Sequence, residues 1–299
     1  MCSVATIAFV LAHAAPGDPA ELFFERAYGR PPTDEEVVML QERMGLNRPL
    51  LLQYTSFMGG LPRGDLGRSW ATGQSVTAAL AGSVPATVAL ALSALVVAIV
   101  IGAPLGVAAA YQPGAALDQI SRALAVAGAS VPAFVLGYVF ILVFSVKLRL
   151  LPVFGAGSPS HLVLPAVTLA FATAATYARL VRASVLETLG EEYIRAALAK
   201  GLTHRAVLVR HALPNAVLPL LTMVAISLGH LLGGAVIVEW VFSWPGLGRL
   251  AVEAIYARDY PLVQGVMLFG GAVFGVVSLA ADVMYCWVDP RVRHVAGSS

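Results

Sequence analysis

Long stretches without a charged side chain limit the fold of this chain more than any other feature. No Asp, Glu, Lys or Arg occurs between Ser69 and Leu117. Charged residues make up 12% of the chain and apolar residues 58%, against about 25% and about 45–50% in ordinary globular proteins. The mean hydropathy is +0.79. A soluble protein of this length needs more charge to cover its surface, so the sequence predicts an all-α, polytopic membrane protein.

Apolar runs locate the transmembrane helices. A helix needs about 20 predominantly apolar residues to cross about 30 Å of hydrocarbon. Five runs have this character: 84–110, 123–146, 162–178, 217–238 and 262–281. The run at 1–15 is short for a span, and it lacks the positive n-region of a cleaved signal peptide. We expect it to be a first helix that is short or starts upstream. The prediction is about six transmembrane helices in a single permease-like domain, 1–299.

The positive charges between these runs set the orientation. With the N-terminus in the cytoplasm, nine Lys and Arg residues fall in cytoplasmic segments and four in short external loops. The cytoplasmic residues are Arg122, Arg179, Arg182, Arg195, Lys200, Arg205, Arg210, Arg291 and Arg293, and the external residues are Lys147, Arg149, Arg249 and Arg258. Cytoplasmic loops of membrane proteins are enriched in Lys and Arg. Both termini are therefore predicted to be cytoplasmic.

The segment 16–80 is predicted to lie on the external side. Its first residues, Pro-Gly-Asp-Pro at 16–19, form a turn that ends the first helix, because proline cannot continue one. Thr33 stands three residues before Glu36, which is the spacing of a capping box. We expect a short amphipathic helix there and a Gly- and Pro-rich stretch after Gly45. The segment is either a solvated loop or part of a docking face for an extracytoplasmic partner.

A second polar segment, 187–215, is cytoplasmic by the same charge count. Strong helix formers run from Glu191 to Lys200, with acids first and a lysine last, as the helix dipole favours. Gly201 is placed to end this helix in the left-handed region. Thr203 is a candidate N-cap for a second helix, which Pro214 should stop. Two short helices joined at a glycine would form a compact projection from the membrane.

The residues of this projection resemble the "EAA…G…I-LP" loop of ABC-importer permeases. Arg195-Ala196-Ala197 is followed after three residues by Gly201, and after nine further residues by His211-Ala212-Leu213-Pro214. Arg195 replaces the usual glutamate and His211 the usual isoleucine. Both departures resemble the dipeptide/oligopeptide (and nickel) permease subfamily, closest to its first dipeptide permease subunit. Five further segments are similar to that subfamily in the same order: 15–19 (APGDP), 64–69 (GDLGRS), 241–249 (VFSWPGLGR), 258–261 (RDYP) and 289–291 (DPR).

The resemblance implies a type I ABC-importer permease fold in the cytoplasmic membrane of a prokaryote. It implies ATP-driven import of di- or oligopeptides, with nickel or another small solute as the alternative cargo. The implied partners are a second permease subunit, ATP-binding cassette subunits that bind ATP and Mg, an extracytoplasmic peptide-binding protein and membrane lipid, and no nucleic acid.

In this family the loop docks in a groove of the ATPase and transmits its closure. The residues expected to carry that coupling here are Arg195, Ala196, Ala197, Lys200, Gly201, Leu202, His211, Pro214 and Asn215. Ala196, Ala197 and Leu202 would form a small apolar knob, and His204, Arg205 and Arg210 a positive rim.

The chain itself is not expected to be an enzyme or to hold a cofactor or metal. It contains no G-x-x-x-x-G-K-[ST] loop, and its two lysines, Lys147 and Lys200, are not placed to hold phosphates. Secondary transporters, the rival class, usually keep charges near mid-membrane or show inverted repeats, and this sequence shows neither. A membrane-embedded hydrolase would need a catalytic cluster, which is also absent. No substrate-binding residue is predicted; His230 is interpreted as a packing residue and Asp282 as a helix-end residue.

The predicted orientation can be tested with cysteines placed at Thr33, Asp65 and Thr203. An impermeant maleimide should label the first two positions in intact cells, because segment 16–80 is external. The third should react only after the membrane is opened. Labelling of Thr203→Cys alone in intact cells would reverse the topology.

Overall fold

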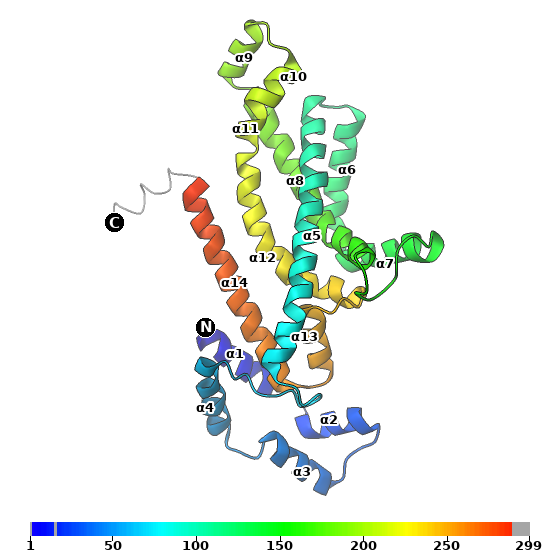
Figure 1. The fold of residues 1–299 in the computed structure, drawn as a ribbon, viewed down its shortest axis with the longest axis vertical. Coiled ribbons are helices and arrows are strands. Elements are labelled where there is room, and N and C mark those ends of the chain that lie inside the picture. Colours follow the sequence, from blue (N-terminus) through cyan, green and yellow to red (C-terminus); the bar gives the residue numbers. More distant parts are fainter. Residues whose placement is uncertain (1, 15–16, 289–299) are drawn as a thin grey trace, which may run out of the picture. The chain divides into compact units, whose positions relative to one another are not determined.

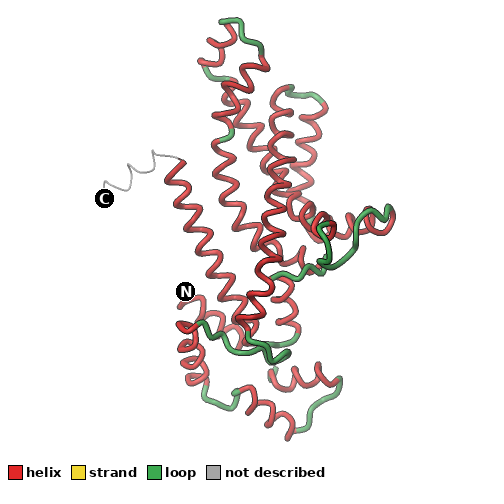
Figure 2. The backbone as a smooth tube through the Cα atoms, viewed as in Figure 1, coloured by secondary structure: helices red, strands yellow, loops and turns green. Residues whose placement is uncertain are grey.

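A computed structural model describes residues 2–14 and 17–288, without the side chains of 234, 277, 278 and 280–288. Throughout these residues the regular elements are helices, and the only strand-like pairing is one isolated bridge between Arg68 and Ser75 (Figures 1 and 2). The chain divides into two compact units. Unit 1 comprises residues 1–87 and 245–275, and unit 2 comprises 88–244 and 276–299.

Unit 1 contains the external segment and the helix that precedes it. Its helices are α1 (Cys2–His13), α2 (Pro19–Tyr28), α3 (Asp34–Met44), α4 (Leu50–Gly60), the 3-10 turn η1 (Leu61–Arg63) and α13 (Leu247–Tyr256). Two long helices, α5 (Val76–Tyr111) and α14 (Tyr260–Val288), begin in this unit and continue into unit 2. Its core groups the buried residues Val76, Leu80, Ala254 and Leu262.

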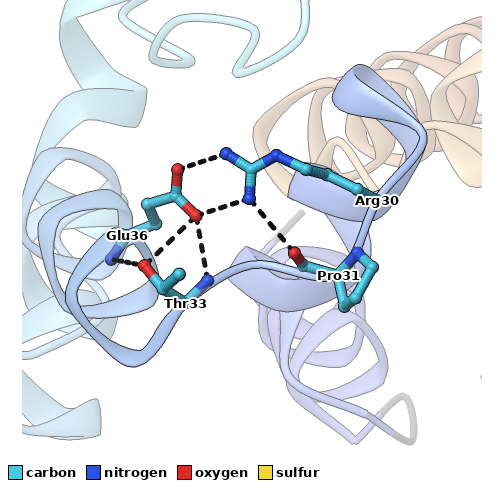
Figure 3. A network of polar contacts seen from close by, with 4 residues as sticks. All are labelled: Arg30, Pro31, Thr33 and Glu36. Carbon is cyan, nitrogen blue, oxygen red and sulfur yellow. Dashed lines mark hydrogen bonds and ion pairs between the residues drawn. The ribbon is translucent and has the colours of Figure 1, made fainter.

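The capping box predicted at Thr33 is confirmed (Figure 3). The Glu36 amide donates to Thr33 Oγ1 at 3.4 Å, and the Thr33 amide donates to Glu36 Oε2 at 2.9 Å. Arg30 adds an ion pair with Glu36, 2.6 Å from its Nη2 to Oε1. The hydrogen bond from Arg30, helped by the Thr33 amide, lowers the pKa of Glu36 to about 2. Because the folded pKa is depressed, this support for α3 is present above the usual pKa of glutamate and is lost only as the pH falls toward 2.

The Gly- and Pro-rich stretch after Gly45 contains a helix that was not predicted, α4 at 50–60. Pro49 precedes its first turn and the two glycines stand at its last positions, so neither interrupts the helix. Helix α4 packs against α1: the Phe9 ring lies 5.3 Å from Tyr54 and 5.9 Å from Phe57. The short helices α2 and α13 were also not predicted. Arg26 links them, because its Nη1 donates to the carbonyl of Tyr256 at 2.5 Å.

Unit 2 contains the helical hairpins and the polar projection. Its helices are α6 (Ala116–Ser130), α7 (Ala133–Phe140) with the π-helical continuation η2 (Ile141–Lys147), α8 (Ser160–Leu189), α9 (Glu192–Ala199), α10 (His204–Val207), the π-helical η3 (Leu208–Ala212), α11 (Leu213–Ala216) and α12 (Leu218–Val241). The predicted span 123–146 is not one straight helix, because α6 and α7 meet at 112°. Pro132 explains the break: it forces Val131 into an extended conformation, with φ −90° and ψ 119°.

Two helices, or up to four if each bent pair is one span, are long and apolar enough to cross a membrane, which is roughly consistent with the six predicted. Helices α5 and α8 qualify as they stand, and two bent pairs, 116–147 and 204–233, qualify if each is one span. Residues Cys2–His13 and Tyr260–Val276 form shorter apolar helices. Helix α8 extends to Leu189, well beyond the predicted end at 178, so the first residues of segment 187–215 belong to its last turn.

Small residues let α5 and α6 lie directly against α8. A Cβ atom on Gly102 would lie 2.5 Å from the carbonyl oxygen of Ala174, and one on Gly106 would lie 2.6 Å from that of Ala178. A Cβ on Gly128 of α6 would meet the Cβ of Ala175 at 2.7 Å. Small side chains are how membrane helices gain close backbone contact in the absence of a hydrophobic driving force. These contacts make α8 the central helix of unit 2.

Gly102→Ala should therefore destabilise the permease. The added methyl group meets a backbone carbonyl of α8, which cannot rotate away, and overpacking of this kind costs about 1–3 kcal/mol. We expect a lower thermal midpoint in nanodiscs. Gly82→Ala is the matched control on the same helix, because its Cβ would meet nothing within 4 Å. Equal midpoints for the two variants would contradict the packing described here.

Candidate functional site

The segment 187–215 forms a helical projection at one end of α8 and α12 (Figure 1). Helix α9 ends at Ala199, and Gly201 follows in the left-handed region with φ +86°, as predicted. The Gly201 amide donates to the carbonyl of Leu198 at 2.9 Å and closes the helix end. A side chain at position 201 would meet nothing within 4 Å, so the backbone conformation alone requires glycine there.

Thr203 caps the second helical stretch, also as predicted: its Oγ1 accepts from the Ala206 amide at 3.3 Å. The prediction that Pro214 stops this stretch is wrong. The chain passes from α10 into the π-helical η3, and Pro214 then lies in the first turn of α11. Proline has no N–H to donate and is tolerated in a first helical turn. The change of hydrogen-bonding pattern just before Pro214 lets the helical path continue toward α12.

The exposed surface of the projection differs from the predicted knob at one residue. Ala196 is exposed and Leu202 is 38% exposed, as expected, but Ala197 is only 8% exposed. Ala197 lies in the core of the projection with Ile194 of the same helix, and Val207, Leu208, Ala212 and Ala216 are buried there too. Along α9, positions 194 and 197 fall on one face and 195, 196 and 199 on the other. Ala196 and Ala197 are adjacent and identical in the sequence, which therefore does not show which of them faces inward.

Exposed charges of both signs lie on the projection, with the acids Glu187, Glu191 and Glu192 at its start and the cations after them. Arg195, Lys200, Arg205 and Arg210 are exposed, and among the described residues their side chains have no ion pair or hydrogen bond. His204 is exposed and His211 is half-buried. Unpaired surface cations around a small apolar patch fit an acidic groove on a partner protein.

Hydrogen bonds from Asn215, another of the predicted site residues, hold the projection together. Asn215 Nδ2 donates to the Tyr193 hydroxyl at 2.9 Å and to the His211 carbonyl at 3.3 Å. Asn215 thus joins α11 to α9. Both Asn215 and its neighbour Pro214 are exposed. Tyr193 was not predicted to be a site residue, because its role depends on this contact with a residue 22 positions away in the sequence.

Comparisons with known proteins agree with this arrangement. Residues 102–294 match the family described as "Binding-protein-dependent transport system inner membrane component", and residues 1–91 match its N-terminal family. The chain is 39% identical over 292 residues to the glutathione transport system permease protein GsiC of Escherichia coli O6:H1, which covers 97% of this chain and 94% of that protein. The corresponding protein of Salmonella choleraesuis is 38% identical over the same shares.

The chain belongs to the binding-protein-dependent permease family of ABC importers. A solved structure of the MetNI methionine ABC transporter, in inward-facing conformations, has the same fold: the match has a TM-score of 0.58 and 22% identity over 71% of this chain and 96% of that one. The expected type I permease fold is confirmed. Members of the family are permease subunits, and the family implies a partner permease and an ATPase.

A buried carboxylate fixes α8 of this permease close to the projection. Asp118 is 1% exposed, and its Oδ1 accepts from Arg182 Nε of α8 at 2.7 Å. Its Oδ2 accepts from Arg182 Nη2 at 3.1 Å, from Arg122 Nη2 at 3.0 Å and from the Gly114 amide at 2.8 Å. Two-pronged arginine pairing fixes geometry as well as charge. In the sequence, Arg122 and Arg182 indicated only the orientation of the chain in the membrane. In the structure, they join the first turn of α6 to α8 through Asp118.

Two of the family-like segments meet in unit 1. Asp259 is fully buried, and its Oδ2 accepts from the Ser69 hydroxyl at 2.5 Å and from the Ala71 amide at 3.3 Å. Its Oδ1 accepts from the Trp70 amide at 3.2 Å. Thr72 Oγ1 donates to Ser69 Oγ at 2.9 Å. Asp259 thereby holds the loop before α5 against the start of α14, which sequence spacing could not reveal across 190 positions.

The two ionisable residues predicted inside the spans have different outcomes. His230 is exposed on α12 and has no hydrogen-bond partner among the described residues, so the expected packing role is wrong. The side chain of Asp282 lies outside those described, as does segment 289–291.

Proposed function

We propose that this permease subunit serves an importer of short peptides and that segment 187–215 is its docking element for the ATPase. The relatives that support the cargo are named glutathione transport permeases, and glutathione is a tripeptide. The similarity extends over 97% of the chain. The observation that carries the docking role is the projection itself, a compact helical element with an exposed Ala196 and Leu202 among unpaired cations.

The proposed complex contains this chain, a second permease subunit, the ATPase and an extracytoplasmic peptide-binding protein. ATP and Mg would be held by the ATPase, whose hydrolysis supplies the energy. In this chain, the residues proposed to face the ATPase groove are Arg195, Ala196, Lys200 and Leu202. Gly201, Pro214, Asn215, His211 and the buried Ala197 would maintain the shape of the projection rather than contact the groove.

The projection can transmit movement because it is attached at both ends to long helices. Its first end is continuous with α8, apart from a turn at Gly190, and its second end leads into α12. Domain movements of this kind need rigid elements joined at a few residues that absorb dihedral change. The bond between Asn215 and Tyr193 and the buried side chains supply the rigidity. The 44° bend between 204–216 and 218–233 marks one such joint.

The exposed face of α12 with His230 is proposed to border the pathway or the second permease subunit. An imidazole in contact with lipid tails would be costly and unsatisfied. Water in a pathway, or a polar group of a partner, would satisfy it. Gly233 lies on the same exposed stretch, and a Cβ there would meet nothing within 4 Å of this chain.

The proposed cargo is tested by uptake into proteoliposomes that contain the complete importer with its binding protein. Labelled dipeptides or glutathione should accumulate when ATP is enclosed with the ATPase, whereas this chain alone should neither take up solute nor hydrolyse ATP. Accumulation of Ni²⁺ but not of peptides would contradict the proposed cargo. Uptake by the single chain would contradict the importer assembly.

The docking role is tested by Ala196→Asp and Gly201→Val in the same proteoliposomes. The first places an unpaired carboxylate in the groove, where desolvation is costly. The second forces a β-branched residue to φ +86° at a strain of about 1–3 kcal/mol. Both should abolish most uptake and binding-protein-stimulated ATPase activity while the subunit still inserts. Ala116→Asp, at an exposed position in the first turn of α6, is the control. Wild-type uptake in both variants would make the projection an ordinary cytoplasmic loop.

A further inference from the structure

Unit 1 contains a pocket that the transport mechanism above does not use. It encloses about 850 Å³ of space not filled by protein atoms, part of it open to solvent. Its walls come from α1, the joint between α3 and α4, α4 itself, residues 65–70 and the start of α14. All of these segments belong to one compact unit.

Two mostly buried side chains with polar groups line this pocket. Gln264 is 6% exposed and Tyr260, one turn before it on α14, is 5% exposed. Both line the pocket, and among the described residues neither the Gln264 amide nor the Tyr260 hydroxyl has a hydrogen bond. Neither polar group is among the described side-chain atoms that are buried without a partner, so both remain accessible. Both can therefore form hydrogen bonds with a molecule in the pocket.

His13 adds an imidazole ring to the wall. Its Nδ1 lies 2.9 Å from the carbonyl oxygen of Phe9, and its Nε2 lies 3.1 Å from Gln53 Oε1. The Gln53 amide nitrogen already donates to the carbonyls of Leu46 and Arg48, so Oε1 must be the atom that faces the ring. Both ring nitrogens therefore face oxygen atoms of this chain, which fixes the orientation of the ring.

The charged lining completes a distinct chemical pattern. Arg48 and Asp65 are exposed at the pocket and carry opposite charges. Asp65 Oδ1 accepts from the Gly67 amide at 2.9 Å, which fixes the carboxylate. Trp70 and Tyr260, with ring centroids 5.4 Å apart, form an aromatic wall. Ligand sites typically combine apolar walls with a few convergent polar groups.

We propose that this pocket binds a small zwitterion that carries a carboxylate and an ammonium group, such as a short peptide. The carboxylate lies toward Arg48, the ammonium group toward Asp65, and the peptide group receives hydrogen bonds from Gln264 and Tyr260. The inference rests on the proposed peptide cargo. It assigns to this subunit a ligand site of its own, separate from the segment proposed to dock the ATPase.

The test uses the assembled importer in phosphatidylglycerol nanodiscs without its binding protein, with alanyl-alanine as the probe in calorimetry. Alanyl-alanine should bind, and its N-acetylated, C-amidated analogue, which has neither charge, should not. Gln264→Met should weaken binding about two- to tenfold, the range expected for one hydrogen bond. Gln74→Met, the same change at an exposed position outside the pocket, should leave the affinity unchanged.

If Gln264→Met fails to assemble, Tyr260→Phe, which removes only the hydroxyl, should weaken binding over the same range. Equal binding of the blocked analogue, or unchanged affinity in these variants, would overturn the proposal. Loss of peptide binding in nanodiscs that contain phosphatidylethanolamine would assign the pocket to a lipid headgroup and overturn it as well. Peptide uptake by the complete importer without peptide binding here would refute the pocket alone, and absence of uptake would refute the proposed cargo.

Discussion

The close contact of α5 and α6 with α8 is the constraint on which unit 2 depends. Gly102 and Gly106 lie against backbone carbonyls of α8, and Gly128 lies against the Cβ of Ala175. Larger side chains at these positions would separate the helices, because the atoms they meet are mostly backbone. Toward the end of α8 that leads into the projection, Arg182 forms an ion pair with the buried Asp118. In the proposed coupling, movement of the projection would act on α8 together with its packed neighbours.

Charge has different roles on the projection and in the unit 1 pocket. On the projection, Arg195, Lys200, Arg205 and Arg210 are exposed and unpaired among the described residues, which suits a complementary protein surface. In the unit 1 pocket, Arg48 and Asp65 lie beside aromatic rings and the polar side chains of Gln264 and Tyr260, which suits a small ligand. The buried charges Asp118 and Asp259, by contrast, are fully engaged within the chain. A buried charge needs partners of this kind, because leaving it without them is strongly destabilising.

Local chemistry was predictable from the sequence, whereas the environment of side chains was not. The capping box at Thr33, the left-handed Gly201 and the cap at Thr203 each depend on residues a few positions apart, and all three are confirmed. Pro214 was misjudged because a π-helical turn accommodates it, and the break at Pro132 was missed because the apolar run continues through it. The burial of Ala197, the exposure of His230 and the pairing of Ser69 with Asp259 depend on tertiary packing, which no periodicity of the chain records.

Cross-linking at the projection tests the central claim most directly. Ala196→Cys and Ala197→Cys would be compared in the assembled importer, each with a cysteine in the groove of the ATPase. The account predicts a rapid disulfide from the exposed position 196 and little or none from the buried position 197, with the yield at 196 changing when ATP binds. Equal yields from the two positions, or no cross-link from position 196 in any nucleotide state, would contradict it.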